Sequence, residues 1–347
     1  MIVSGFEGTC LNSQTEKLVA EQGIGGLILF ERNFEDPRQL KKLIEDLQAV
    51  TATNSPPLFI SVDQEGGRVA RLKEPFTQFP PMCCLGQANS EDLAYRFGLA
   101  MGNEMRAVGI NMDYAPVLDV HSNPENPIIG KRAISSDPEV VARLGCKIIK
   151  GFKDAGVYPV GKHFPGHGDT SQDSHLTLPR VERKNESLEQ VELAPFKMAF
   201  REGLEIIMTA HVVYPAWDKS SAATFSSPIL KDLLRDKMGF DGLVMSDDLE
   251  MQAVTQDPEE IPALAVNAGV DLFLICHDLS KVTRIQNALI AGVESGKIPA
   301  EAVERSFEKI LKAKQNLTGQ AHEEIDLNQV LEENKKLADE MSAHLTQ

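Results

Sequence analysis

Short apolar runs alternate with longer amphipathic stretches through most of this chain. Seven runs have the length and apolar content of buried strands: Gly26–Phe30, Leu58–Asp63, Met112–Asp119, Val157–His163, Ile206–Val213, Leu243–Asp247 and Val270–Cys276. Ile2–Phe6 is the candidate for an eighth strand, and a helix is expected after it near Thr15–Glu21. This alternation is typical of repeated βα units around a parallel sheet.

Capping signals mark where the helices between these strands begin. Asp36-Pro37, Asp137-Pro138 and Ser227-Pro228 each place a capping side chain before a proline at the first helical position. Ser187-Leu-Glu-Gln190 is typical of a capping box. The helix expected after Ser90 has one apolar stripe and stops at Gly109; the stripe consists of Leu93, Phe97, Met101, Met105 and Val108. Other helices are expected to end at a glycine just before the next strand, at Gly156, Gly203, Gly239 and Gly269.

Eight βα units that close on themselves predict an α/β fold of the TIM type, a (β/α)8 barrel. No glycine- or proline-rich linker divides the chain, so residues 1–347 are expected to form a single domain. The segment from about Glu301 to the end is charged and helical in pattern, and we expect it to be an extension packed on the outside, with a break near Gln320–Glu324. An open doubly wound sheet is the alternative, but the glycine-rich phosphate loop that usually follows its first strand is absent.

Composition narrows the class of protein further. The 51 acidic and 35 basic residues give a net charge of −16, which argues against nucleic acid or an anionic membrane as a partner. The five cysteines form no CxxC pair, which favours free thiols in a reducing compartment. No signal-peptide pattern and no apolar run of transmembrane length is present, so a cytoplasmic location is expected. The oligomeric state is not predicted.

The stretch from Lys162 to His175 concentrates the candidate chemistry. It contains three histidines, two aspartates and a lysine, and its glycines and proline rule out a helix. Asp173 and His175 are two positions apart, so in an extended segment they point to the same side. A carboxylate beside an imidazole can fix its tautomer and raise its basicity.

Polar side chains also end several other expected strands, where a barrel places its active site. Asp63, Asp119, Lys162-His163, His211 and Asp247 fall there. A carboxylate in the position of Asp247 suits nucleophilic attack on an anomeric carbon, whereas Asp248 is equally well explained as a helix N-cap. Asp63 is suited to bind a sugar hydroxyl.

For four residues the sequence does not exclude a purely structural role. Glu65 or Arg68 could form a structural ion pair, and Arg132 could be an exposed, solvated arginine. His211 is more typical of a hydrogen-bonded core histidine than of a catalytic one.

Two chemistries fit the loop from Lys162 to His175. In one, its histidines and aspartates ligate a divalent metal that activates water, although the HxH pair of such barrels and thiolate ligands are lacking. In the other, Asp247 is the nucleophile of glycoside hydrolysis and an Asp–His pair on the loop transfers the proton, in place of the usual second carboxylate.

Six stretches of the chain resemble the family 3 glycoside hydrolases: GGLILFERNFEDP, FISVDQEGGRVARL, NMDYAPVLDV, IIGKRAISSDP, GKHFPGHGDTSQDSH and VMSDDLEM. Within that family the DSH dyad is similar to the bacterial NagZ-type β-N-acetylglucosaminidases of peptidoglycan recycling. The absence of a further C-terminal domain or signal peptide resembles the single-domain cytoplasmic form.

The resemblance implies a role for each matching residue. Asp247 would be the nucleophile that forms a covalent glycosyl-enzyme, and His175 the general acid/base with Asp173 as its partner. The terminal N-acetylglucosamine would be bound by Asp63, Arg71, Arg132, Lys162 and His163. The expected substrate is a muropeptide or oligosaccharide carrying this sugar, with no cofactor and no metal. The alternatives are a metal-dependent barrel hydrolase, a family 3 β-glucosidase, an N-acetylglucosaminide phosphorylase and a catalytically silent sugar-binding protein.

Overall fold

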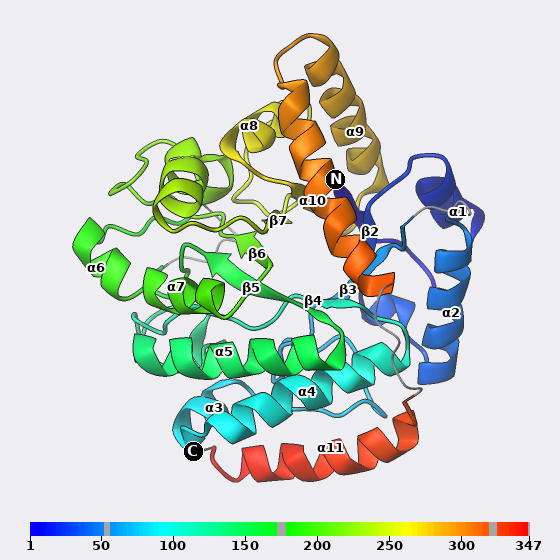
Figure 1. The fold of residues 1–347 in the computed structure, drawn as a ribbon, viewed down its shortest axis with the longest axis vertical. Helices are drawn as coiled ribbons and strands as arrows, with labels where there is room; N and C mark the ends of the chain where they lie inside the picture. Colours follow the sequence, from blue (N-terminus) through cyan, green and yellow to red (C-terminus); the bar gives the residue numbers. More distant parts are fainter. Residues whose placement is uncertain (52–55, 172–177, 319–324, 346–347) are drawn as a thin grey trace.

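Eight parallel strands form a closed barrel in chain order, as the sequence predicts (Figure 1). The computed structural model describes residues 1–51, 56–171, 178–318 and 325–345. The strands are β1 (Ile2–Ser4), β2 (Gly26–Leu29), β3 (Phe59–Val62), β4 (Met112–Asp113), β5 (Tyr158–Phe164), β6 (Ile206–Thr209), β7 (Leu243–Asp248) and β8 (Leu272–Ile275). The TIM-type α/β fold is therefore confirmed.

Two strands are shorter than their apolar runs indicate. The run Met112–Asp119 contributes only Met112–Asp113 to the barrel, and the run Ile206–Val213 ends as a strand at Thr209. Pro116 has no N–H to give to the sheet, although the Leu118 N–H again donates to the Lys162 carbonyl at 2.7 Å. The rest of the apolar run after Met112 packs in the core and keeps an isolated bridge to β5, between Val117 and Lys162.

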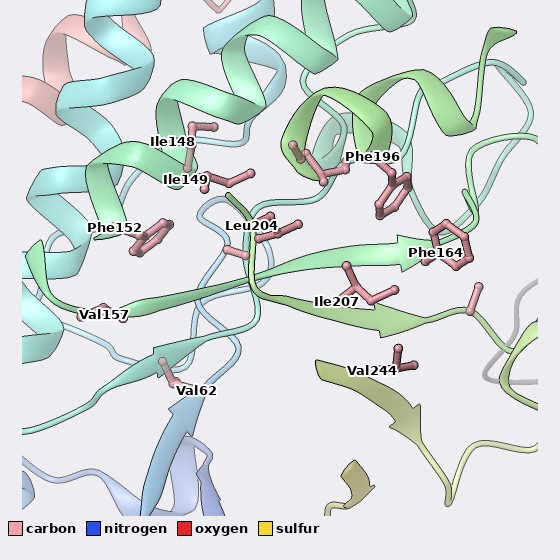
Figure 2. Close-up of a cluster of buried hydrophobic side chains, with 14 of the residues drawn as sticks. Val62, Ile148, Ile149, Phe152, Val157, Phe164, Phe196, Leu204, Ile207 and Val244 are labelled. Atoms are coloured by element: carbon pink, nitrogen blue, oxygen red, sulfur yellow. The ribbon is translucent and has the colours of Figure 1, made fainter. Parts of the chain in front are cut away.

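The helical segments that surround the barrel are α1 (Ser13–Ala20), η1 (Glu31–Asn33), α2 (Pro37–Ala49), α3 (Cys83–Ala88), α4 (Glu91–Ala107), η2 (Gly130–Arg132), α5 (Pro138–Ala155), α6 (Asn185–Gln190), α7 (Leu193–Arg201), η3 (Ala223–Phe225), η4 (Pro228–Lys237, wound as a π-helix), α8 (Ile261–Ala268), α9 (Leu279–Glu294), α10 (Ala300–Thr318) and α11 (Leu327–Ser342). The apolar sides of many of them cover the outer face of the barrel. Figure 2 shows part of this layer, in which Ile148, Ile149 and Phe152 of α5 lie over β5 in one buried cluster with Leu204 and Ile207.

Most of the expected helix signals are confirmed. Asp36 accepts hydrogen bonds from the Arg38 and Gln39 amides, and Asp137 accepts one from Glu139. Ser90 caps α4, and Gly156 ends α5 with a left-handed φ of 81°.

Two capping predictions are wrong. Ser227 makes no side-chain cap; the hydroxyl of Ser226 accepts from the Ile229 amide instead. Ser187 lies inside α6, which begins at Asn185 because the Asn185 side chain is held by Glu189 and Trp217.

The two C-terminal helices pack differently from each other. Figure 1 shows α11 on the outside against α4, where Arg96 binds Glu340 at 3.0 and 2.7 Å. Helix α10 instead packs Ile310 and Ala313 against the barrel interior, and the hydroxyl of Tyr158 donates to the Ala313 carbonyl at 3.0 Å. The prediction of an outer helical segment thus fits α11, whereas α10 covers the amino ends of the strands. Residues 319–324, which include the whole of the expected break, lie outside the described residues.

Strand periodicity places the site. Side chains alternate between the inside and the outside of a barrel, and the inward series includes Phe59 on β3, Tyr158 and Val160 on β5, and Leu243 and Met245 on β7. Polar side chains continue each series: Asp63 is four residues after Phe59, whereas Lys162 and Asp247 are two residues after Val160 and Met245. No helix in the described part of the chain is long and apolar enough to cross a membrane.

Candidate active site

A cavity of about 190 Å³ opens at the carboxyl ends of the strands. It is lined by Ile28, Phe30, Asp63, Arg71, Tyr114, Ile128, Arg132, Lys162, His163, His167, Met208, Asp247, Asp248, Met251, Leu274, Cys276 and His277. The structure therefore brings together all the expected site residues that it describes. Asp173 and His175 lie outside the described residues, which stop at Ser171 and resume at Leu178.

One wall of the cavity is an ion-paired cluster. The Lys162 ammonium lies 2.5 Å from Asp63 and 2.6 Å from Glu65. The Arg132 guanidinium binds Glu65 with two hydrogen bonds, of 2.8 Å from Nε and 2.7 Å from Nη2. Glu65 and Lys162 are almost fully buried, with side chains 1% and 3% exposed.

The pKa values of this wall follow from its pairing. Burial opposes ionisation of Glu65, but the charges of Arg132 and Lys162 outweigh it and hold its pKa well below the usual range. Burial likewise opposes the charge on Lys162, and Asp63 and Glu65 reverse this, so the pKa of Lys162 is raised. The cluster stays ionised at neutral pH and presents fixed charges to the cavity.

Arg71 extends the same wall. One of its guanidinium nitrogens lies 3.3 Å from Asp63, while its buried Nε has no hydrogen-bond partner. Its backbone is held by the Gln64 side chain, which accepts from the Arg71 and Leu72 amides at 2.6 and 3.1 Å. Gln64 therefore fixes the loop that carries Asp63, Glu65 and Arg71.

Asp119 orients two histidines from below the cavity. It lies 2.6 Å from Nδ1 of His163 and accepts from the His163 and His167 amides at 3.1 and 2.6 Å. Burial opposes the charge of Asp119, but His163 outweighs it and holds the pKa of Asp119 below its usual value, so Asp119 accepts a hydrogen bond from the Nδ1–H of His163 and leaves Nε2 for a ligand. His167 is buried, its pKa is lowered to about 4 by burial and then by His163, and its Nδ1 lies 2.8 Å from the Thr170 hydroxyl.

Adjacent carboxylates end β7, and both line the cavity. Burial opposes ionisation of Asp247, but the charges of His163 and His211 prevail, so its pKa lies below the usual value. Burial and then the charge of Glu250 raise the pKa of Asp248 to about 7. Asp247 is therefore the carboxylate that is ionised at neutral pH.

His211 is a core histidine that supports this pair. It is fully buried, its Nδ1 lies 2.8 Å from the Thr224 hydroxyl, and its Nε2 donates to the Asp248 carbonyl at 3.1 Å. Burial lowers its pKa, in agreement with a neutral ring. His211 is thus a hydrogen-bonded core histidine, as expected. It lies directly behind Asp247 and Asp248 and holds the end of β7 in place.

The roles of two residues of the site, Glu65 and Asp119, were not predicted from the sequence. Glu65 pairs with Arg132 and Lys162, while Arg68, the expected alternative member of an ion pair, donates to the Ile128 carbonyl. Asp119 was seen only as a polar strand end, whereas it organises His163 and His167. Arg132 is not a solvated arginine, because its side chain is only 10% exposed. The feature of the sequence that could have indicated these ion pairs is the occurrence of charged residues of both signs at the ends of several strands.

The described part of the loop that leads to Asp173 and His175 is in contact with residues from elsewhere in the chain, Asn126 and Glu192. The Asn126 amide donates to the carbonyls of His167 and Gly168, each at 2.9 Å. Beneath Gly166 lies Glu192, which accepts from the Ser122 hydroxyl at 2.7 Å, while its Oε2 is buried without a partner. Within the described ranges, no group of three or more His, Cys, Asp or Glu is arranged to hold a metal ion.

Comparison with known proteins finds relatives of this chain in both sequence and structure. Residues 4–313 match the family described as the glycosyl hydrolase family 3 N terminal domain. The beta-hexosaminidase of Alkalilimnicola ehrlichii is 41% identical over 285 residues, which is 80% of each chain. A solved family 3 beta-N-acetylglucosaminidase from Paenibacillus has a TM-score of 0.94 and 41% identity over 99% of this chain and 67% of its own. NagZ from Neisseria gonorrhoeae has a TM-score of 0.81 and 33% identity over 97% of both chains.

Proposed function

The chain belongs to glycosyl hydrolase family 3, and from this premise we propose that it is a retaining β-N-acetylhexosaminidase with Asp247 as its nucleophile. The substrate class is a glycoside with a terminal, β-linked N-acetylglucosamine, as the names of its relatives indicate. The observation that carries the proposal is the ionised Asp247 carboxylate, which faces the ion-paired wall across a cavity at the mouth of the barrel. We assign the whole of residues 1–347 to one catalytic domain with its C-terminal helical extension.

The ion-paired wall suits recognition of sugar hydroxyls. Asp63 and His163 offer acceptors, and Arg71, Arg132 and Lys162 offer donors whose positions are fixed by their partners. Fixed dipoles and charges of this kind bind a ligand without reorganising when it arrives. The non-reducing sugar would lie against this wall with its anomeric carbon towards Asp247.

The reaction would proceed by two displacements. An Asp247 oxygen attacks the anomeric carbon while the bond to the leaving oxygen breaks, and His175 gives its proton to that oxygen. His175 then takes a proton from water, which attacks the anomeric carbon and releases Asp247. The net change is hydrolysis with the β configuration kept.

The assignment of His175 and Asp173 rests on the resemblance of the KHFPGHG and DSH elements, since both residues lie outside the described ones. Among the described histidines of the loop, His163 is bound to Asp119, and His167 has a pKa of about 4. A group with that pKa is a poor proton donor near pH 7, which leaves the acid/base role to another residue.

The test of the acid/base pair is His175→Ala with two leaving groups. An aryl glycoside with an acidic phenol should form the glycosyl-enzyme and then stall, and azide should restore turnover and give a β-glycosyl azide. A natural disaccharide should scarcely react, because acid catalysis is worth about 10²–10⁴-fold for a poor leaving group. Equal slowing of both substrates with no effect of azide would reject His175, and Asp173 alone or His167 would be tested next.

The natural aglycone is proposed to be a muropeptide from cell-wall recycling. Three cations (Arg71, Arg132, Lys162) face two carboxylates (Asp63, Glu65) in the wall, so it keeps one positive charge, which suits a substrate that carries a carboxylate. A panel of aryl β-N-acetylglucosaminide, β-glucoside and β-xyloside, each assayed with and without phosphate, separates this proposal from a β-glucosidase and from a phosphorylase. Formation of N-acetylglucosamine 1-phosphate would identify the phosphorylase.

A further inference from the structure

The cavity has a second wall, opposite in character to the ion-paired one. Phe30, Met251, Cys276 and His277 form it with the Asp248 carboxyl group. These side chains come from the ends of β2, β7 and β8 and from the turns that follow them. None of them has a role in binding hydroxyls or in the two displacements described above.

A β-bulge brings Asp248 to this wall. In a regular strand, adjacent residues point to opposite faces, so Asp247 and Asp248 could not both face the barrel mouth. In β7, however, Met245 pairs with Leu272 and Asp248 pairs with Leu274, so three steps on β7 match two on β8. The extra residue places the second carboxyl group beside the first, on the same cavity.

Asp248 is held but retains hydrogen-bonding capacity. Its Oδ1 accepts from the Glu250 amide at 3.1 Å, the Cys276 thiol bonds to the same carboxyl group, and its backbone carbonyl accepts from His211. A carboxylate has about four acceptor positions, so a ligand can still donate to it. Burial, and to a smaller extent the charge of Glu250, raises the pKa of Asp248 to about 7. This agrees with a carboxyl group in largely apolar surroundings.

Phe30, Met251 and Cys276 make most of the rest of the wall apolar, and the exposed His277 lies at its edge, 3.1 Å from the Arg32 guanidinium. The Phe30 ring lies 5.1 Å from the ring of His277, and the Arg32 guanidinium stacks on Phe30 at 4.5 Å. Arg32 in turn donates to the Cys276 carbonyl at 2.7 Å. One carboxyl group set among apolar side chains is suited to a ligand group that has an N–H donor next to a methyl group.

We propose that this wall recognises the 2-acetamido group of the substrate, with Asp248 accepting its N–H and Phe30 and Met251 contacting its methyl group. The proposal rests on the proposed function, in which Asp247 bonds to the anomeric carbon. In the sugar, the carbon that bears the acetamido group is the direct neighbour of the anomeric carbon. In the chain, Asp248 is the direct neighbour of Asp247, so the acetamido group would lie on the side of the cavity where Asp248 is. Asp248 is thereby the residue that determines preference for an N-acetylglucosaminide over a glucoside.

The test compares kcat/KM for a matched pair of 4-nitrophenyl glycosides, the β-N-acetylglucosaminide and the β-glucoside. Asp248→Asn should lower the ratio of the two values by about 10-fold or more, because it weakens only the bond to the amide. Met251→Ala should lower the ratio about 3- to 10-fold through lost contact with the methyl group. Asp63→Asn is the control: it acts on hydroxyls that both sugars share, so it should slow both substrates and leave the ratio unchanged.

Where glucoside hydrolysis is too slow to measure, the ratio of the inhibition constants of N-acetylglucosamine and glucose, both competitive inhibitors, reports the preference for the acetamido group in binding. An equal fall for both sugars in Asp248→Asn, at an unchanged melting temperature, overturns the assignment. If Asp248→Asn does not fold, an unchanged ratio in Met251→Ala overturns it. A wild-type protein that hydrolyses neither glycoside rejects the proposed function itself, which is a different outcome from wild-type activity with an unaltered ratio.

Discussion

Replacing Glu65 by glutamine tests whether the ion-paired wall holds the sugar-binding cations in place. The variant keeps the volume of the side chain and removes its charge. Glu65 accepts three hydrogen bonds from Arg132 and Lys162, at 2.8, 2.7 and 2.6 Å, and its side chain is 1% exposed. A glutamine amide has only one accepting oxygen: at the place of Oε1 it still accepts from Lys162 and from Nη2 of Arg132, but its NH2 group then faces Nε of Arg132, which loses its acceptor.

The size of the effect follows from what the variant leaves behind. Removing one member of a buried ion pair typically costs about 3–5 kcal/mol, because the remaining charge is buried without compensation. Lys162 still has Asp63 at 2.5 Å, so the free energy of unfolding should fall by about 3 kcal/mol, the lower end of this range. Since Arg132 loses the charge of Glu65 and the acceptor of one of its two bonds, kcat/KM should fall about 10- to 100-fold as well.

Urea unfolding followed by circular dichroism and hydrolysis of an aryl β-N-acetylglucosaminide measure the two effects. Glu31→Gln is the matched control, since Glu31 is paired with Lys73 on the surface at 3.7 Å with 69% of its side chain exposed. That variant should change the free energy of unfolding by less than about 0.5 kcal/mol. A loss below about 1 kcal/mol in Glu65→Gln with unchanged activity would refute the view that buried pairing holds this wall.

Three further predictions concern other parts of the site. Asp247→Asn should abolish turnover and leave the melting temperature near that of wild type, because Asp247 lines the cavity; retained activity would move the nucleophile to Asp248. Prolonged chelation should leave the rate unchanged, and a loss that Zn²⁺ or Mn²⁺ restores would revive the metal-dependent alternative. The third concerns Glu192, whose pKa burial raises from its usual 4.5 to about 8. The folded state therefore binds more protons between these values, and the free energy of unfolding of wild type should fall by up to about 1.4 kcal/mol per pH unit as pH rises through that window. Glu192→Gln should remove this slope in urea unfolding at pH 5, 6.5 and 8, and identical slopes in both proteins would reject the assignment.

The strands and the position of the site could be predicted because both follow from the pattern of apolar and polar residues within a few positions along the chain. A barrel strand must be apolar on both faces, so runs such as Leu243–Asp247 are visible without knowledge of their neighbours. The polar residue that ends such a run then falls at the mouth of the barrel. Where tertiary contacts decide, local signals fail: Ser187 has the spacing of a capping box, but contacts of Asn185 with Glu189 and Trp217 begin α6 before it.

The charge partners were not predictable for the same reason. Glu65 is 67 residues from Arg132 in the sequence, and only closure of the barrel brings the two within 2.7 Å. Arg68, three positions from Glu65, is the obvious local partner and is used elsewhere. Residue types at the strand ends thus indicate a polar site, whereas their pairing depends on the order and register of the strands.

The bulge in β7 shows what pattern alone misses and why it matters for the chemistry. Strict alternation directs only one of Asp247 and Asp248 into the cavity, yet both line it. Their surroundings then drive their pKa values apart: burial opposes both charges, but His163 and His211 stabilise that of Asp247, whereas Glu250 adds to the effect of burial on Asp248. Two carboxyl groups in different environments can take different tasks at one pH. One inserted residue therefore places the proposed nucleophile, Asp247, and the proposed recognition group, Asp248, side by side on a single strand.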